Sequence, residues 1–119
     1  MPRARGVVPG RNRRKKILKK SRGNVGGRSR LFKNANETHL RSLNYAYAHR
    51  RTKKRDFRRL WITRINAAAR ENGLSYSALI AGLKAANVEI NRKLLAELAV
   101  TDSGAFKDLA EVARTHQAS

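Results

Sequence analysis

Positive charge is concentrated in the first half of the chain, and this restricts what that half can fold into. Residues 1–60 contain 21 of the 28 Lys and Arg residues but only two acidic residues, so their net charge is +19. Residues 61–119 contain seven basic and six acidic residues, a net charge of +1. Apolar residues shift the other way, from 18 of 60 to 30 of 59. The first half therefore cannot bury enough apolar area to fold alone, whereas the second half can build a small core.

A net charge of +20 also predicts the kind of partner. Like charges at this density repel one another in a compact fold, so a polyanion is needed to neutralise them. Nucleic acid is favoured, because Lys and Arg neutralise phosphates and release condensed counterions. A membrane surface is the weaker alternative, and no run of about 18 apolar residues could span a bilayer. The absence of cysteine excludes disulfides and Cys-based zinc sites and fits a reducing cytosol.

The N-terminal segment is divided by glycines and prolines. Pro2 and Pro9, with the neighbouring glycines at positions 6 and 10, predict an irregular leader. A short helix could follow over Arg11–Arg22, where eight of the twelve residues are basic. Three glycines at positions 23, 26 and 27 then interrupt the chain and predict a hinge at which backbone can approach RNA closely.

A long helix is predicted next, because residues 28–72 contain neither Gly nor Pro and Gly73 suits a left-handed cap. Fully formed, it would extend for about 65 Å, which is too long for the interior of so small a domain. Its middle is polar on every face, since Ala48 and Phe57 are the only apolar residues in Ala48–Arg59. Like charges four residues apart, such as Arg51 and Arg55, oppose this helix. We therefore expect it to be stably helical only when phosphates surround it.

The second half shows three apolar stripes at helical spacing. Ser75, Asn91 and either Thr101 or Asp102 are suitable N-caps for three short helices. The expected fold is all-α, with a basic extension over residues 1–59 (irregular leader, short helix and long helix) and a small helical bundle over residues 60–119. The residues expected to form the core are Trp61, Ile65, Leu79, Ile80, Leu83, Leu94, Leu95, Leu98, Phe106 and Leu109.

Basic side chains are the candidate RNA contacts, and phosphate contacts of this kind position a chain without reading base sequence. A solvated tail or a targeting signal is the alternative for the run Arg11–Arg22. Aromatic side chains among the cations, Tyr45, Tyr47 and Phe57, could stack on unpaired bases or pack on protein. Trp61 begins the apolar stripe, which favours a core position over stacking. The residues expected to contact RNA are Arg3, Arg5, Arg11, Arg13, Arg14, Lys15, Lys16, Lys19, Lys20, Arg22, Arg28, Arg30, Arg50, Arg51, Lys53, Lys54, Arg55, Arg58, Arg59 and Arg64.

No pattern in the sequence indicates catalysis, a cofactor or a metal. Of the three histidines, His39 and His49 are ten residues apart and neither has a Cys or carboxylate companion at metal-ligand spacing. The glycines match neither a phosphate loop nor a dinucleotide fingerprint. Charge alone would permit a DNA-binding protein of the chromatin type as well as an RNA-binding protein. A dedicated RNA-binding repressor is a further alternative.

The run from Lys54 to Arg70, KRDFRRLWITRINAAAR, resembles the signature of the bacterial large-subunit ribosomal protein twenty family. The opening Met-Pro-Arg, the basic run at positions 13–16, and the segments at positions 45–47, 74–77 and 90–93 also fit it, so the resemblance covers essentially the whole chain. One departure is Asn24, where the family often has an aromatic residue after the glycine.

The resemblance implies a structural, non-enzymatic component of the large ribosomal subunit in the cytoplasm. It implies direct binding to large-subunit rRNA, a role early in subunit assembly, and other ribosomal proteins as neighbours. Repression of translation by binding to its own message is a further role that some members of the family have. No membrane association is expected.

Overall fold

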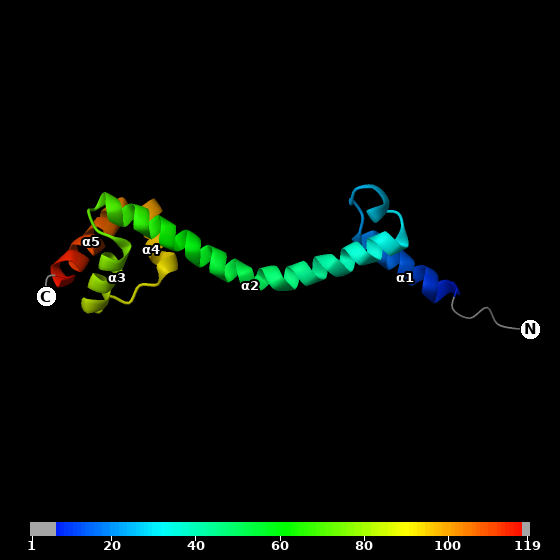
Figure 1. Ribbon diagram of the computed structural model, residues 1–119, viewed down its shortest axis with the longest axis horizontal. Coiled ribbons are helices and arrows are strands. Elements are labelled where there is room, and N and C mark those ends of the chain that lie inside the picture. Colours follow the sequence, from blue (N-terminus) through cyan, green and yellow to red (C-terminus); the bar gives the residue numbers. More distant parts are fainter. Residues whose placement is uncertain (1–6, 118–119) are drawn as a thin grey trace, which may run out of the picture. The chain divides into compact units, whose positions relative to one another are not determined.

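The computed structural model describes residues 7–117, and this part of the chain is all-α (Figure 1). It contains no strand, so the expected fold class is confirmed, including the long helix and the small C-terminal group of helices. The elements in chain order are α1 (Val7–Lys20), the 3-10 turn η1 (Gly26–Arg28), α2 (Phe32–Glu71), α3 (Tyr76–Ala85), α4 (Arg92–Thr101) and α5 (Ser103–Gln117).

The long helix α2 ends as its sequence predicts. Gly73 adopts a left-handed φ of 74°, and its N–H donates to the Arg70 carbonyl at 3.0 Å. The N–H of Leu74 reaches the Ala69 carbonyl at 2.9 Å, which completes the two-bond motif typical of such an ending. At the other end, α2 begins at Phe32 rather than Arg28, because Gly26–Arg28 form the 3-10 turn.

The expected irregular leader is wrong for residues 7–10, which form the first turn of α1; residues 1–6 lie outside the described residues. A proline is compatible with a first helical turn, because the N–H groups there have no partner within the helix. Pro9 therefore occupies a position at which it breaks no hydrogen bond. The expected break after α1 is confirmed, since Gly23 and Gly26 have φ values of 90° and 64°.

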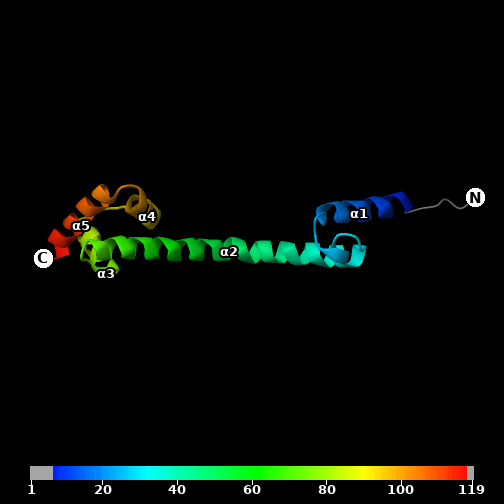
Figure 2. The same cartoon turned by 90° about the horizontal axis from the view of Figure 1, so that it is seen from above.

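The contacts divide the chain into two compact units, Met1–Arg51 and Thr52–Ser119, and α2 contributes residues to both. In the first unit, α1 lies beside the start of α2 (Figure 2). The buried Ser21 hydroxyl donates to the Ala35 carbonyl at 3.2 Å, and the Arg14 guanidinium lies 5.6 Å from the centre of the Phe32 ring. The division into residues 1–59 and 60–119 that the charge pattern suggests stays a prediction.

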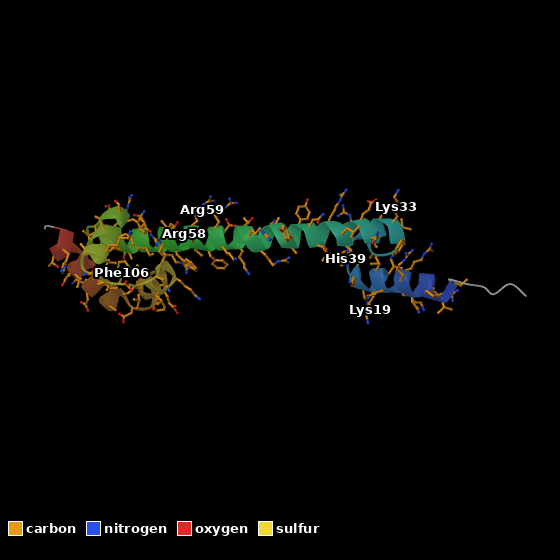
Figure 3. The ribbon with its side chains drawn as sticks, turned by 90° about the horizontal axis from the view of Figure 1, so that it is seen from below. Lys19, Lys33, His39, Arg58, Arg59 and Phe106 are labelled. Atoms are coloured by element: carbon orange, nitrogen blue, oxygen red, sulfur yellow. The ribbon has the colours of Figure 1, made fainter. Side chains whose placement is uncertain are left out.

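In the second unit, α3, α4 and α5 gather beside the end of α2, with Phe106 among them (Figures 1 and 3). All three expected caps form: Ser75 accepts from the Ala78 N–H at 3.2 Å, and Asn91 from the Leu94 N–H at 2.9 Å. Asp102, rather than Thr101, caps α5 by accepting from the Ala105 N–H at 3.0 Å. These caps satisfy N–H groups in the first turn and set where each short helix starts.

Most of the residues expected in the core lie there. Ile65, Leu79, Leu83, Leu95 and Phe106 are buried, Trp61, Ile80 and Leu109 are partly buried against the core, and Leu98 is half-buried. The prediction that Leu94 lies in the core is wrong, because its side chain is 50% exposed. Helix α4 buries the neighbouring Leu95 and Ala96 instead, and successive residues of a helix point about 100° apart. The expected set also lacks the small residues that let the helices approach, Ala68, Ala69, Ala96, Ala110 and Ala113.

Candidate nucleic-acid interface

The cations expected to contact RNA are exposed wherever the structure describes them. These exposed cations lie in α1 and the turn after it, in the segment before α2 (Arg28 and Arg30), and in α2 as far as Arg64. Arg3 and Arg5 lie outside the described residues. None of these described guanidinium and ammonium groups is buried by the rest of the chain, so they remain available to phosphates.

The middle of α2 is not covered by any other described part of the chain. Every residue from Lys53 to Leu60 is exposed, and Asp56 is the only acid among them. Side chains with nitrogen tips extend from both sides of the helix, and Arg58 and Arg59 are among them (Figure 3). A helix with cations around its whole circumference can meet phosphates on several sides at once, which a one-sided basic patch cannot do.

Three aromatic side chains interrupt this basic surface, and all three are exposed: Tyr45 by 62%, Tyr47 by 57% and Phe57 by 49%. Tyr45 stacks against His49 with ring centres 5.9 Å apart. The Arg51 guanidinium lies 3.6 Å from the centre of the Tyr47 ring and donates to the Tyr47 carbonyl at 3.1 Å. A cation thus already covers one face of Tyr47, whereas stacking of these rings on bases stays a prediction.

Trp61 combines a core contact with an open surface. It is partly buried against the core, and its ring centre lies 6.2 Å from that of Phe57. It also lines two grooves. One, of about 520 Å³, is bounded by Lys53, Lys54, Phe57, Arg58, Trp61 and Lys93. The other, of about 300 Å³, is bounded by Trp61, Arg64, Lys93, Ala96, Glu97, Val100 and Thr101. Trp61 therefore both packs against the core and forms part of the surface of two grooves.

Several exposed cations are absent from the expected contacts. Lys33 and Arg41 lie in the same glycine-free stretch as the others, so extending the basic run along α2 would have included them. Arg41 also lines a polar groove on α2 of about 520 Å³, together with Arg28, Asn34, Glu37, Thr38, Ser42 and Tyr45. Lys93 is different, because it belongs to the weakly charged half and only the packing of α4 brings it to the same groove as Phe57.

The described part of the chain shows neither a metal site nor a membrane-spanning helix. Within residues 7–117, no group of three or more His, Cys, Asp or Glu side chains could hold a metal ion. The same residues contain no helix that is both long enough and apolar enough to cross a membrane.

An exposed basic helix with interspersed aromatic rings, joined to a small helical core, defines a nucleic-acid-binding protein of the all-α class. Residues 3–109 match the family described as Ribosomal protein L20. The sequence is 60% identical over 115 residues to the large ribosomal subunit protein bL20 of Brevibacillus brevis (strain 47 / JCM 6285 / NBRC 100599), covering 97% of each chain. It is 58% identical over 114 residues to the protein of the same name from Clostridium novyi (strain NT), covering 96% of each.

The chain belongs to the ribosomal protein L20 family. It is accordingly a structural, non-enzymatic constituent of the large ribosomal subunit, a particle that also contains rRNA and other ribosomal proteins. The resemblance of the segment from Lys54 to Arg70 is confirmed, and with it the expected location on the ribosome.

Proposed function

We propose that the chain binds large-subunit rRNA directly, through the exposed cations that run from α1 to Arg64, and that it does so early in subunit assembly. The observation that carries this proposal is the exposure of every one of these cations within residues 7–117. A protein-covered helix would hide at least one face, whereas Lys53–Leu60 of α2 hides none. Phosphates are the partners that such a surface fits, because each contact releases condensed counterions.

Early binding follows from the same geometry. Contacts on several sides of one helix require RNA on several sides, and a helix cannot enter between RNA segments that have already packed together. The protein must therefore be in place before those segments close around α2. Its cations then lower the repulsion between the approaching phosphate backbones, which promotes the closure.

The salt dependence of binding tests direct contact with RNA. If about ten cations neutralise phosphates, log K for large-subunit rRNA should fall against log salt with a slope of about −7 to −9. Filter binding over a range of KCl concentrations measures it, with a DNA duplex of equal charge as competitor. A slope shallower than about −3 would show that the basic helices are not the anchor. Equal displacement by the duplex would favour a general DNA-binding protein.

Order-of-addition reconstitution tests the timing. Large-subunit rRNA incubated with this protein before the other ribosomal proteins should yield compact particles that keep it through a high-salt wash in a sucrose gradient. Adding it last should leave it mostly unbound. Equal incorporation in either order would contradict the early role while leaving direct binding intact.

The same surface is suited to a second RNA target, the message that encodes the protein. Such binding would need a message segment folded like the ribosomal site, because phosphate contacts read shape rather than sequence. Purified protein should then reduce in-vitro translation of its own message, and added large-subunit rRNA should restore it. Equal inhibition of an unrelated message would exclude specific repression.

A further inference from the structure

We propose that the groove lined by Phe57, Trp61 and Lys93 binds an unpaired RNA nucleotide, with its base against the two rings and its flanking phosphates on the surrounding cations. The site deepens the proposed function and rests on it, because it assigns a particular RNA element to a particular place on the chain. The groove has a volume of about 520 Å³ and lies entirely within the second unit.

The aromatic surface of the groove is both open and held in place. Phe57 and Trp61 are four residues apart on α2, so they lie on the same face of the helix. Their ring centres are 6.2 Å apart and their planes are tilted by 38°. Trp61 is fixed from behind by its packing against the core, whereas Phe57 is 49% exposed. A ring packed against the core, beside an exposed ring, offers a stacking surface that loses less side-chain freedom on binding than two fully exposed rings would.

The charge of the groove fits phosphate. Four of its six lining residues are cations, Lys53, Lys54, Arg58 and Lys93, and none is acidic. Three of them come from α2, and Lys93 comes from the first turn of α4. Phosphates on either side of a bound base would therefore meet positive charge from both helices.

The position of Lys93 is not explained by the stability of α4. The first turn of a helix favours acidic side chains because of the helix dipole, yet the first turn of α4 has none and contains Arg92 and Lys93 instead. The Arg92 Nε donates to the Tyr76 hydroxyl at 2.8 Å, and the Asn91 side chain caps the helix. These two bonds anchor the start of α4 and thereby hold Lys93 at the edge of the groove.

An unpaired nucleotide fits these features better than an RNA duplex or an acidic peptide. Bases in a duplex are stacked on one another and leave no face for Phe57 or Trp61. An acidic peptide could neutralise the cations but would leave the aromatic faces uncovered. Stacking on aromatic rings combined with a basic rim is the way in which proteins bind single-stranded nucleic acid.

Intrinsic fluorescence of the full-length chain tests the proposal, because Trp61 is its only tryptophan and lines this groove, and the Phe57 variants distinguish this groove from the second one that Trp61 lines. The protein is titrated with four probes at equal ionic strength: single-stranded octaadenylate, an eight-base-pair RNA duplex, inorganic polyphosphate and hexaglutamate. Calorimetry measures binding of each probe independently. We expect octaadenylate to quench Trp61 strongly, whereas the duplex and polyphosphate should bind without comparable quenching.

Variants locate the effect. Phe57→Leu should weaken the octaadenylate affinity reported by quenching about fivefold or more, whereas Phe57→Tyr, which keeps the ring, should not. Lys93→Gln should weaken it about threefold, and Lys107→Gln, an equal charge change at an exposed position of α5, should not. Thermal melts followed by circular dichroism check that each variant remains folded.

Three results would overturn the nucleotide site: octaadenylate that binds without quenching, polyphosphate that quenches as strongly, or hexaglutamate that quenches as strongly and points to a protein partner. A steep salt slope for rRNA in the same preparation would show that the proposed function survives such a result. A shallow slope would instead remove the proposed function itself.

Discussion

At the scale of single residues, small side chains decide how closely the helices of the second unit approach. Gly82 of α3 is buried, and a Cβ built on it would lie 2.7 Å from the Ala113 Cα of α5 and closer still to the Ala113 carbonyl oxygen. The three nearest atoms are all backbone atoms of Ala113, so the clash could not be relieved by a flexible side chain moving aside. Glycine is needed at position 82 because the backbone of Ala113 lies so close. Its own φ does not require glycine, because it is not in the left-handed region.

Gly82→Ala should therefore destabilise the second unit, although alanine favours helices over glycine by about 1 kcal/mol. The clash with α5 should outweigh this gain, with a net cost of about 2 kcal/mol and a melting temperature lower by about 10 °C. Gly10→Ala is the matched control, because Gly10 is also helical and nothing lies within 4 Å of its Cβ position. Calorimetry that finds Gly82→Ala as stable as the parent would disprove this close contact.

At the scale of elements, α2 is the feature that simple sequence rules predict best. A stretch without Gly or Pro, ended by Gly73, is enough to place its C-terminus, because a left-handed cap depends on a few adjacent residues. The start of α1 was harder to predict. Pro9 suggests irregular backbone, yet a proline in the first turn of a helix breaks no hydrogen bond. Recognising Pro9 as part of a first turn requires knowing where α1 starts, and no polar capping residue in the sequence marks that start.

The stability of α2 should vary along its length. Arg51 with Arg55 and Lys54 with Arg58 are like-charge pairs on an uncovered segment, whereas Ile65, Ala68 and Ala69 anchor the helix in the core. In the free protein at low salt, amide hydrogens of residues 50–59 should exchange at least about tenfold faster than those of residues 65–71. Adding large-subunit rRNA should protect the faster segment, because phosphates remove the repulsion. Hydrogen exchange read by mass spectrometry measures both; equal protection without RNA would mean that helix propensity outweighs the repulsion.

At the scale of the whole molecule, the two units differ in what holds them together. Met1–Arg51 contains 16 of the basic residues and one acid, and among its residues from Val7 onward Ser21 is the only buried polar one. Of the buried apolar residues in the described part of the chain, all but Ala35 belong to Thr52–Ser119. Apolar burial can stabilise the second unit without RNA, whereas charge repulsion opposes order in the first.

A fragment of residues 52–119 should therefore fold cooperatively alone, whereas residues 1–51 should be largely disordered in low salt and gain helix when rRNA is added. Circular dichroism of both fragments, with and without RNA, measures this. The fragment 52–119 should keep weaker, shape-dependent RNA binding. A strongly helical fragment 1–51 in the absence of RNA would contradict the prediction that phosphates complete its order.

By itself, the sequence determined the division of charge, the helical class, the end of α2 and the caps at Ser75 and Asn91, because each depends on residues only a few positions apart. Only the tertiary structure decided that Leu95 rather than Leu94 faces the core, and that Lys93 shares a groove with Phe57 and Trp61. Both outcomes depend on how α4 packs against elements distant in the chain. A helical period shows that a helix has an apolar face, but the angle at which that face meets its neighbours is set by the shapes of all the side chains in the contact.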